Sequence, residues 1–254
     1  MTRQTRKWVA LPALAGFALL LLWGLRGVPL FGHYRGPYGD LLNARAVSER
    51  HITDVVTAVN FDYRGFDTLG EEFILFSSVM GVLLLLRQQR DETQGQPQDE
   101  APQRSAPATS DAVRVLALGL AGPILLFGID VVVHGQLTPG GGFQGGVILS
   151  MAPLLIYLAG DFETVSRITS HTLFEMSESF GAAGYILSGF IGIACGGAFL
   201  QNVLPLGKVG SVFSGGTIPL IDLSVGIEVG AGFVLLAMAF LEETLVERLR
   251  RGAR

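Results

Sequence analysis

The feature that most constrains this chain is a series of long apolar stretches with few or no charged side chains. A helix needs about 20 mostly apolar residues to cross a bilayer, because the hydrocarbon core is about 30 Å thick and each residue adds 1.5 Å. Helices are expected because lipid offers no hydrogen-bond partner to backbone N–H and C=O groups. The predicted spans are residues 8–25, 69–86, 113–133, 145–160, 181–204 and 218–241.

The composition agrees with an all-α polytopic membrane protein of about six transmembrane helices. Charged residues make up 16% of the chain, against about 25% in soluble domains. The net charge of −4 offers no basic surface for nucleic acid. One cysteine, Cys195, excludes a disulfide framework and a cysteine-based zinc site. The sequence has no nucleotide-binding loop, HExxH or G-x-S-x-G motif, so we expect no cofactor, no metal site and no catalytic residues.

The distribution of Lys and Arg predicts the orientation. With the N-terminus inside and six spans, the inner segments hold twelve of these residues and the outer segments six, which favours two cytoplasmic termini. Five of the six lie in the first external loop, and some of them are expected on a buried or interfacial element. The basic start is followed by a long apolar stretch without a small-residue cleavage site, so we expect a retained anchor rather than a signal peptide.

The chain is predicted to consist of two membrane pieces. Residues 87–112 contain no Val, Ile, Leu, Met or aromatic residue and are expected to form a disordered linker. It separates a two-span piece, residues 1–86, from a four-span piece, residues 113–254. Residues 48–60, with Ser48 as N-cap, and residues 163–180 are interpreted as short amphipathic helices. A proton-transfer role for His171 in the second is the alternative.

Two adjacent acids, Glu71 and Glu72, stand near the start of the second span. Acidic residues in a first turn are favourable to the helix dipole, which is one interpretation. The other is that one of the two glutamates points inward and exchanges protons with a hydrated path. Adjacent residues lie about 100° apart on a helix, so one of them faces a given channel. Periodicity does not choose between them.

A glycine-rich break follows the third span. Asp130 and His134 are four residues apart and share a helix face if the helix continues. Broken helices at membrane depth line cavities and bind ions, and histidine titrates near neutrality. A carboxylate–imidazole pair beside this break therefore predicts a proton relay; the alternative is a simple exposed hairpin. The loop residues singled out are Thr138, Pro139, Gly140, Gly141, Gly142, Phe143 and Gln144.

The last span carries Asp222 and Glu228. They are six residues apart and so lie on opposite faces. Asp222 is expected near the outer interface and Glu228 deeper. Intramembrane acids are candidate ion-path residues, and an inter-subunit salt bridge is the competing interpretation.

The segment from His134 to Gly146 resembles the hallmark loop of the MnhB/MrpB family, the B-type subunits of the multi-subunit Mrp-type Na⁺/H⁺ antiporters. Residues 214–220 and 225–230 are similar to the last-span pattern of that family, and the resemblance covers about residues 113–243. Residues 48–86, with Phe66-Asp-Thr-Leu-Gly-Glu71, resemble the C-terminal segment of the large A-type antiporter subunit. The same segment occurs as a separate, small E-type subunit in membrane-bound hydrogenases.

The resemblance implies a prokaryotic plasma-membrane subunit with other Mrp-type subunits as partners, lipid around it, and Na⁺ and H⁺ as transported ions. It assigns the motif glutamate to Glu71 and draws attention to His134 and Pro139. Two alternatives stay open: the equivalent subunit of an ion-pumping hydrogenase-type complex, and a structural assembly subunit. The glycines of residues 181–197 suit the second alternative, because small residues let helices approach closely.

Overall fold

The computed structural model describes residues 3–28, 32, 36–86, 109–160 and 162–252. The chain divides into two compact units, residues 1–41 and residues 42–254. In the first unit, helix α1 (Arg3–Leu25) is exposed along its described residues and includes Pro12. The predicted linker lies outside the described residues except at positions 109–112.

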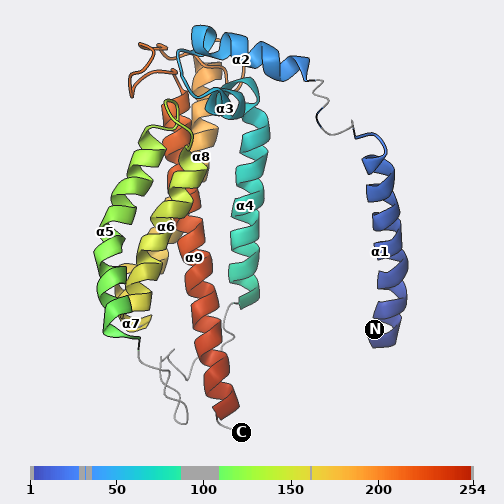
Figure 1. Cartoon of the computed structure of the whole chain (residues 1–254), viewed down its shortest axis with the longest axis vertical. Coiled ribbons are helices and arrows are strands. Elements are labelled where there is room, and N and C mark those ends of the chain that lie inside the picture. The colour runs from blue at the N-terminus through green and yellow to red at the C-terminus, as the bar shows by residue number, and fades with distance from the viewer. Residues whose placement is uncertain (1–2, 29–31, 33–35, 87–108, 161, 253–254) are drawn as a thin grey trace. The chain divides into compact units, whose positions relative to one another are not determined.

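The larger unit is a helical bundle (Figure 1). Helix α2 (Pro37–Arg50) begins in the first unit and ends in this one. The remaining elements are α3 (Val55–Ala58), the π-helix η1 (Val59–Tyr63), α4 (Gly65–Leu86), α5 (Asp111–Val133), α6 (Gly142–Ala159), α7 (Phe162–Ile168), α8 (His171–Ala194) and α9 (Ile218–Gly252).

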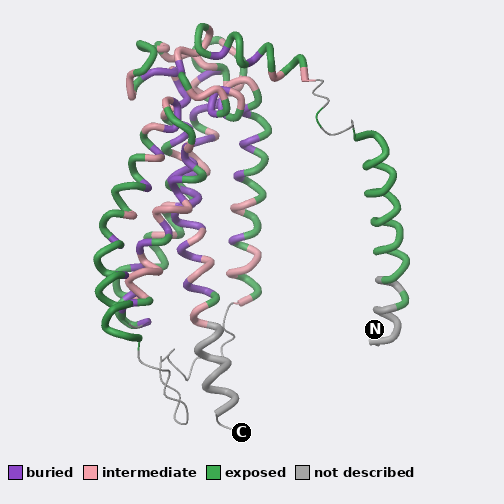
Figure 2. Tube along the Cα trace, in the orientation of Figure 1, coloured by how far each residue is buried: buried purple, intermediate pink, exposed green. Residues whose placement is uncertain are grey.

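Helix α9 is the centre of the bundle. It packs against α4, α5, α6 and α8, and the buried residues follow it and the inward faces of its neighbours (Figure 2). One core cluster joins Ile52, Phe61 and Tyr185 to the first half of α9. A second joins Phe162 and Val165 to its later turns. Because α9 has neighbours around it, polar residues on opposite faces of this helix can both be buried.

Four helices are long and apolar enough to cross a membrane, by length and composition, within the described part of the chain: Gly65–Leu86, Asp111–Val133, Gly142–Ala159 and Ile218–Glu242. In α1 the apolar stretch is shorter, Leu11–Leu25. The all-α membrane fold is therefore confirmed, while the count that meets these criteria is four rather than six.

The predicted span 181–204 is displaced by about three helical turns. Helix α8 begins at His171 and ends at Ala194, and residues 195–217 form loops. The prediction of one amphipathic helix over residues 163–180 is therefore wrong. Its first part is α7, and its second part is the start of α8.

The predicted N-cap at Ser48 is also wrong. Ser48 lies within α2, where its hydroxyl donates to the carbonyl of Arg45. The chain turns at His51, which has a φ of 56°. Helix α3 begins after Asp54, whose Oδ1 accepts the backbone N–H of Val56 at 2.9 Å. An aspartate at this position satisfies one of the free N–H groups of the helix start.

Candidate functional site

The glycine-rich loop packs directly onto α9. The backbone N–H of Gly142 donates to Oδ1 of Asp222 at 2.8 Å. A Cβ built on Gly135 would lie 2.7 Å from Oδ2 of the same carboxyl, and one on Gly142 would lie 2.3 Å from the carbonyl oxygen of Asp222. Gly140 and Gly141 have φ values of 151° and 114°. Glycine is required here by the close approach and by the left-handed backbone.

Asp222 holds this loop in place. It is fully buried, and its Oδ2 has no hydrogen-bond partner among the described residues. Asp222 is therefore enclosed by protein, one turn from the start of α9, and its expected position near the outer interface of the membrane stays a prediction. Asp222 and Glu228 lie on different faces of α9, and both are buried because α9 is surrounded.

The segment before α4 also contacts the loop. The carbonyl of Gln136 accepts the backbone N–H groups of Thr53 and Asp54, each at 3.2 Å. The hydroxyl of Thr57 donates to the carbonyl of Gly135 at 2.7 Å. The break after α5 is thus a junction between the two sequence segments that carry the family resemblance.

Three buried glutamates from three helices lie inside the bundle: Glu72 of α4, Glu178 of α8 and Glu228 of α9. Each has at least one buried carboxyl oxygen without a hydrogen-bond partner in the described part of the chain, and Glu228 has two. Glu228 interacts electrostatically with both other carboxyls. Gly181 permits this packing, because a Cβ there would lie 2.5 Å from the backbone nitrogen of Glu228.

These glutamates are staggered along the bundle. We call the end that carries residues 134–141 and 195–217 the loop end. Glu178 lies beside α9 at Gly232, whose Cβ would be 3.2 Å from Oε1 of Glu178. With a rise of 1.5 Å per residue, Asp222, Glu228 and Gly232, the residue beside Glu178, lie about 6, 15 and 21 Å along α9 from Ile218. Glu72 lies about 10 Å along α4 from Gly65. The acids therefore descend through the bundle in steps of about 5 Å.

The two adjacent glutamates of α4 face different surroundings. Glu72 is 3% exposed, whereas Glu71 is exposed. Within the described residues, Glu71 has neither a hydrogen bond nor an ion pair. The structure thus places one member of the pair inside the bundle and leaves the other, the one favoured by the family motif, on its surface.

Asp130 and His134 form the pair that their spacing predicts. Nδ1 of His134 lies 2.9 Å from Oδ1 of Asp130, and the side chains are 36% and 63% exposed. The pair therefore lies on the surface, apart from the buried acids. The rest of the loop is also partly exposed: Thr138 donates to the carbonyl of His134 at 3.3 Å, and Phe143 packs edge-on against Phe233.

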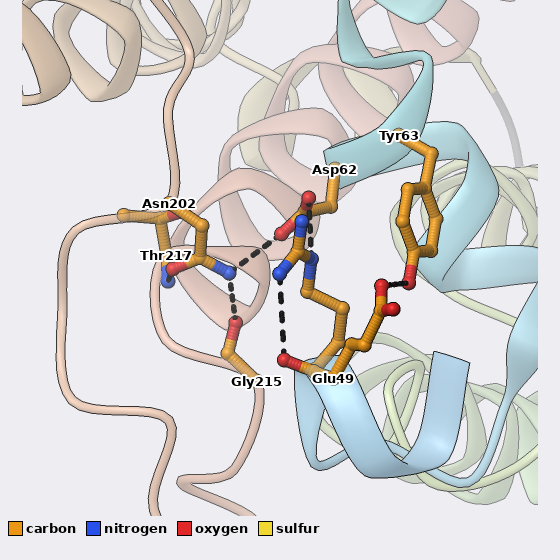
Figure 3. Close-up of polar contacts among 7 residues, drawn as sticks. Glu49, Asp62, Tyr63, Asn202, Gly215 and Thr217 are labelled. Carbon is orange, nitrogen blue, oxygen red and sulfur yellow. Dashed lines mark hydrogen bonds and ion pairs between the residues drawn. The ribbon is translucent and has the colours of Figure 1, made fainter. Parts of the chain in front are cut away.

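A polar network at the loop end was not foreseen from the sequence (Figure 3). Nε of Arg50 donates to Oδ1 of Asp62 at 2.7 Å, and the guanidinium lies 4.9 Å from the ring centre of Tyr63. Nδ2 of Asn202 donates to Oδ2 of Asp62 at 2.8 Å and to the carbonyl of Gly215 at 2.9 Å. The network ties α2, η1 and the loop before α9 together.

A cavity of about 380 Å³ lies beside this network, lined by residues that include Arg50, Arg64, Phe199 and Asn202. Burial and the hydrogen bond to Glu49 raise the pKa of Tyr63 to about 12, so this hydroxyl is a fixed donor.

The ion pairs explain part of the arginine excess in the predicted external loop. Arg50 pairs with Asp62, and Arg64 pairs with Asp67. Their charges are neutralised locally.

Glu178 is the interior acid that sequence reasoning missed. The signal was present, since Glu178 follows His171 and Glu175 on one face of a helical pattern. The sequence predicts residues 163–180 as a short amphipathic helix, and a glutamate is ordinary on the polar face of such a helix. Among the described residues, no group of three His, Cys, Asp or Glu side chains is placed to hold a metal ion.

The fold and these interior acids define a polytopic helical membrane protein. Residues 112–235 match the family described as "Domain related to MnhB subunit of Na+/H+ antiporter". An uncharacterized protein of Methanocaldococcus jannaschii is 32% identical over 221 residues, covering 79% of this chain and 82% of that protein. The B-type subunit of the Na(+)/H(+) antiporter of Alkalihalophilus pseudofirmus is 34% identical over 79 residues, covering 31% of this chain and 54% of that protein.

Two solved structures share the fold. A chain of the membrane-bound sulfane sulfur reductase, an archaeal respiratory membrane complex, has a TM-score of 0.69 and 32% identity, covering 95% of this chain and 98% of that chain. A chain of the Mrp complex from Dietzia sp. has a TM-score of 0.68 and 23% identity, covering 95% of this chain and 26% of that chain. The chain belongs to the MnhB-related family, and it is a membrane subunit of a multi-subunit, antiporter-type complex.

Proposed function

We propose that this subunit carries protons, exchanged for Na⁺ or another cation by its complex, along the row formed by Glu72, Glu228 and Glu178. The observation that carries the proposal is the stagger of these acids through the bundle, with buried oxygens that lack partners. A buried carboxyl without a counter-charge is more stable with a proton or a bound cation than as a bare anion. Neighbouring carboxyls that interact electrostatically do not all ionise together.

In the proposed proton path, Asp222 has a positioning role. It holds the glycine-rich loop against α9 at the loop end of the row, with one oxygen unpaired. Glu71 lies on the surface of α4, where the row borders a neighbouring subunit. Asp130 and His134 form an exposed proton relay at the start of the glycine-rich loop. The chain itself catalyses no reaction. Both termini lie in the cytoplasm of a prokaryote, with the bundle in its plasma membrane surrounded by lipid.

The test uses the whole complex in sealed vesicles and follows internal pH after addition of Na⁺ or K⁺. Glu228→Gln keeps the shape of the side chain and removes its exchangeable proton, so cation-driven proton movement should fall by about tenfold or more, as for other lost acid–base groups. Glu175→Gln is the matched control, because Glu175 is an exposed acid of α8. Normal exchange in Glu228→Gln, with the complex intact, would refute the role of this acid.

A second candidate function is the corresponding subunit of a respiratory reductase. One observation favours it: this chain matches nearly the whole of a chain of the sulfane sulfur reductase complex, whereas it covers about a quarter of the Mrp chain. The single cysteine means that iron–sulfur clusters would belong to other subunits. Affinity purification in mild detergent decides between the two host complexes. Co-purified subunits with cysteine-bound iron–sulfur clusters support the reductase. Co-purified large antiporter subunits, without any cluster-binding subunit, support the antiporter.

A further inference from the structure

Tyr185 extends the row of interior acids toward the loop end. It follows Glu178 by seven residues on α8, which is almost two full turns, so the two side chains share one face of this helix. Tyr185 is fully buried, and it interacts electrostatically with Glu72 of α4. A hydroxyl group inside the bundle therefore lies on the loop-end side of the row.

Helix α4 carries a second buried hydroxyl beside the row. Gly65, Thr68 and Glu72 are separated by three and four residues and are all buried, so they lie along one inward side of α4. The hydroxyl of Thr68 donates to the carbonyl of Asn60 at 2.7 Å. Side chains of a helix lean toward its N-terminus, so the carboxyl of Glu72 is directed back toward Thr68.

The hydroxyl of Tyr185 joins α8 to the start of α4. Its oxygen, Oη, donates to the carbonyl of Gly65 at 2.8 Å. A Cβ built on Gly65 would lie 3.8 Å from this oxygen and 3.8 Å from Cδ1 of Leu200. Gly65 and Leu200 are both lining residues of the cavity at the loop end. Oη of Tyr185 therefore lies directly behind one wall of that cavity.

The cavity is suited to water. Its volume is about 380 Å³, and its lining includes the polar side chains of Asp62, Arg64 and Gln201. A polar cavity of this size has room and hydrogen-bond partners for several water molecules. The order of groups from the cavity inward is thus the hydroxyl of Tyr185, the hydroxyl of Thr68 and the carboxyl of Glu72.

We propose that Tyr185 passes protons between the loop-end cavity and Glu72, with Thr68 as the second hydroxyl. The inference rests on the proposed function, because it names the loop-end entrance to the same row. In the inward direction, Oη of Tyr185 accepts a proton from cavity water and releases its own hydrogen to Oγ1 of Thr68, which releases its hydrogen to the carboxylate of Glu72. Each hydroxyl keeps one hydrogen, and rotation of the O–H bond restores its contact with the backbone carbonyl.

Tyr185→Phe in the whole complex removes the hydroxyl and keeps the ring in the core. Cation-driven proton movement in sealed vesicles should fall by about tenfold or more, at unchanged subunit composition. Ser150→Ala is the control, because it removes another buried hydroxyl that donates to a backbone carbonyl, at 2.7 Å in α6. Normal exchange in an intact Tyr185→Phe complex, or an equal loss in both variants, would overturn the proposal.

Thr68 provides a second test that does not depend on the tyrosine. Thr68→Val keeps the shape of the side chain and removes its hydroxyl, whereas Thr68→Ser keeps the hydroxyl. Exchange should fall in Thr68→Val and be retained in Thr68→Ser. Thr169→Val is the matched control, since Thr169 is also buried and donates to a backbone carbonyl at 2.8 Å, after α7. Equal exchange in Thr68→Val and Thr68→Ser would contradict a relay through this hydroxyl.

Blocking the cavity tests the entrance itself. In a Cys195→Ser background, which removes the exposed native thiol, Gln201→Cys is modified with a trimethylammonium methanethiosulfonate before reconstitution. Exchange should fall several-fold on modification and recover on reduction, as expected for lost access of protons to an acid–base group. Lys208→Cys is the control, because Lys208 is an exposed residue of the same loop that is not among the lining residues. Unchanged exchange in modified Gln201→Cys would overturn entry through the cavity.

The proposed function and this inference can fail separately. Loss of exchange in Glu228→Gln together with normal exchange in Tyr185→Phe would keep the row and reject the entrance. Normal exchange in Glu228→Gln would reject the row itself.

Discussion

Gly142→Ala tests how the glycine-rich loop is fixed to α9. The added Cβ would lie 2.3 Å from the carbonyl oxygen of Asp222 and 2.7 Å from Cβ of Val225. Both are shorter than real Cβ contacts, and neither neighbour can rotate away, because one is backbone and the other lies at the root of a side chain. Helices α6 and α9 must therefore separate, which also stretches the hydrogen bond between Gly142 and Asp222.

The expected cost combines overpacking of about 1–3 kcal/mol with a weakened hydrogen bond to a carboxylate of about 1.5 kcal/mol or more. For a chain of this size each kcal/mol lowers Tm by roughly 2–4 °C. The control is Gly119→Ala, because Gly119 has open space around it and alanine favours the helix. Gly142→Ala should therefore melt roughly 5–15 °C below wild type, while Gly119→Ala melts at or slightly above it.

The assay must report on the bundle. Both tryptophans, Trp8 and Trp23, lie in α1. Intrinsic tryptophan fluorescence therefore reports on the smaller unit, residues 1–41, and not on the bundle. Heating samples in detergent and measuring the surviving monodisperse fraction by size exclusion avoids this problem. Equal melting temperatures for Gly142→Ala and Gly119→Ala would refute the reasoning, because the loop would then not be packed against α9 as closely as the structure shows.

Two further predictions concern the polar contacts at opposite ends of the bundle. Asp62→Asn removes the charge that pairs with Arg50 at 2.7 Å in a partly buried site, so thermal stability should fall by about 1–3 kcal/mol, and an unchanged Tm would contradict the anchoring role of the network. The hydrogen bond with Glu242 raises the pKa of His171; its stabilisation is therefore present below the unfolded pKa of about 6.5 and lost as pH rises through the folded pKa. His171→Gln should accordingly lower Tm at acidic pH and leave it unchanged at alkaline pH. A decrease in Tm confined to alkaline pH would contradict stabilisation by a protonated His171.

The apolar spans were largely predictable, because their lengths follow from the bilayer. The start of α8 was not. His171, Glu175 and Glu178 make its first turns polar, and a polar pattern in a single sequence indicates a membrane interface. Glu178 is buried where α8 packs against α9 at Gly232, which is a long-range contact that local patterning does not contain.

The same limit applies to Glu71 and Glu72. Periodicity establishes that they lie about 100° apart, but which one faces inward depends on where α4 docks against α9. The family motif selected Glu71, and the structure of the chain shows Glu72 inside and Glu71 outside. The pairing of Asp130 with His134, in contrast, depends only on the local i, i+4 spacing at the end of α5, and it was predicted correctly from that spacing.

Infrared difference spectroscopy of the intact complex between acidic and alkaline buffers tests the central claim most directly, since the C=O stretch of a protonated carboxyl is distinct from the bands of a carboxylate. If the interior glutamates exchange protons, wild type should show a loss of protonated-carboxyl signal as pH rises, reduced in Glu228→Gln and preserved in Glu175→Gln, whose lost acid is exposed. Identical difference spectra for wild type and Glu228→Gln, in complexes of equal composition, would contradict a proton path through this row.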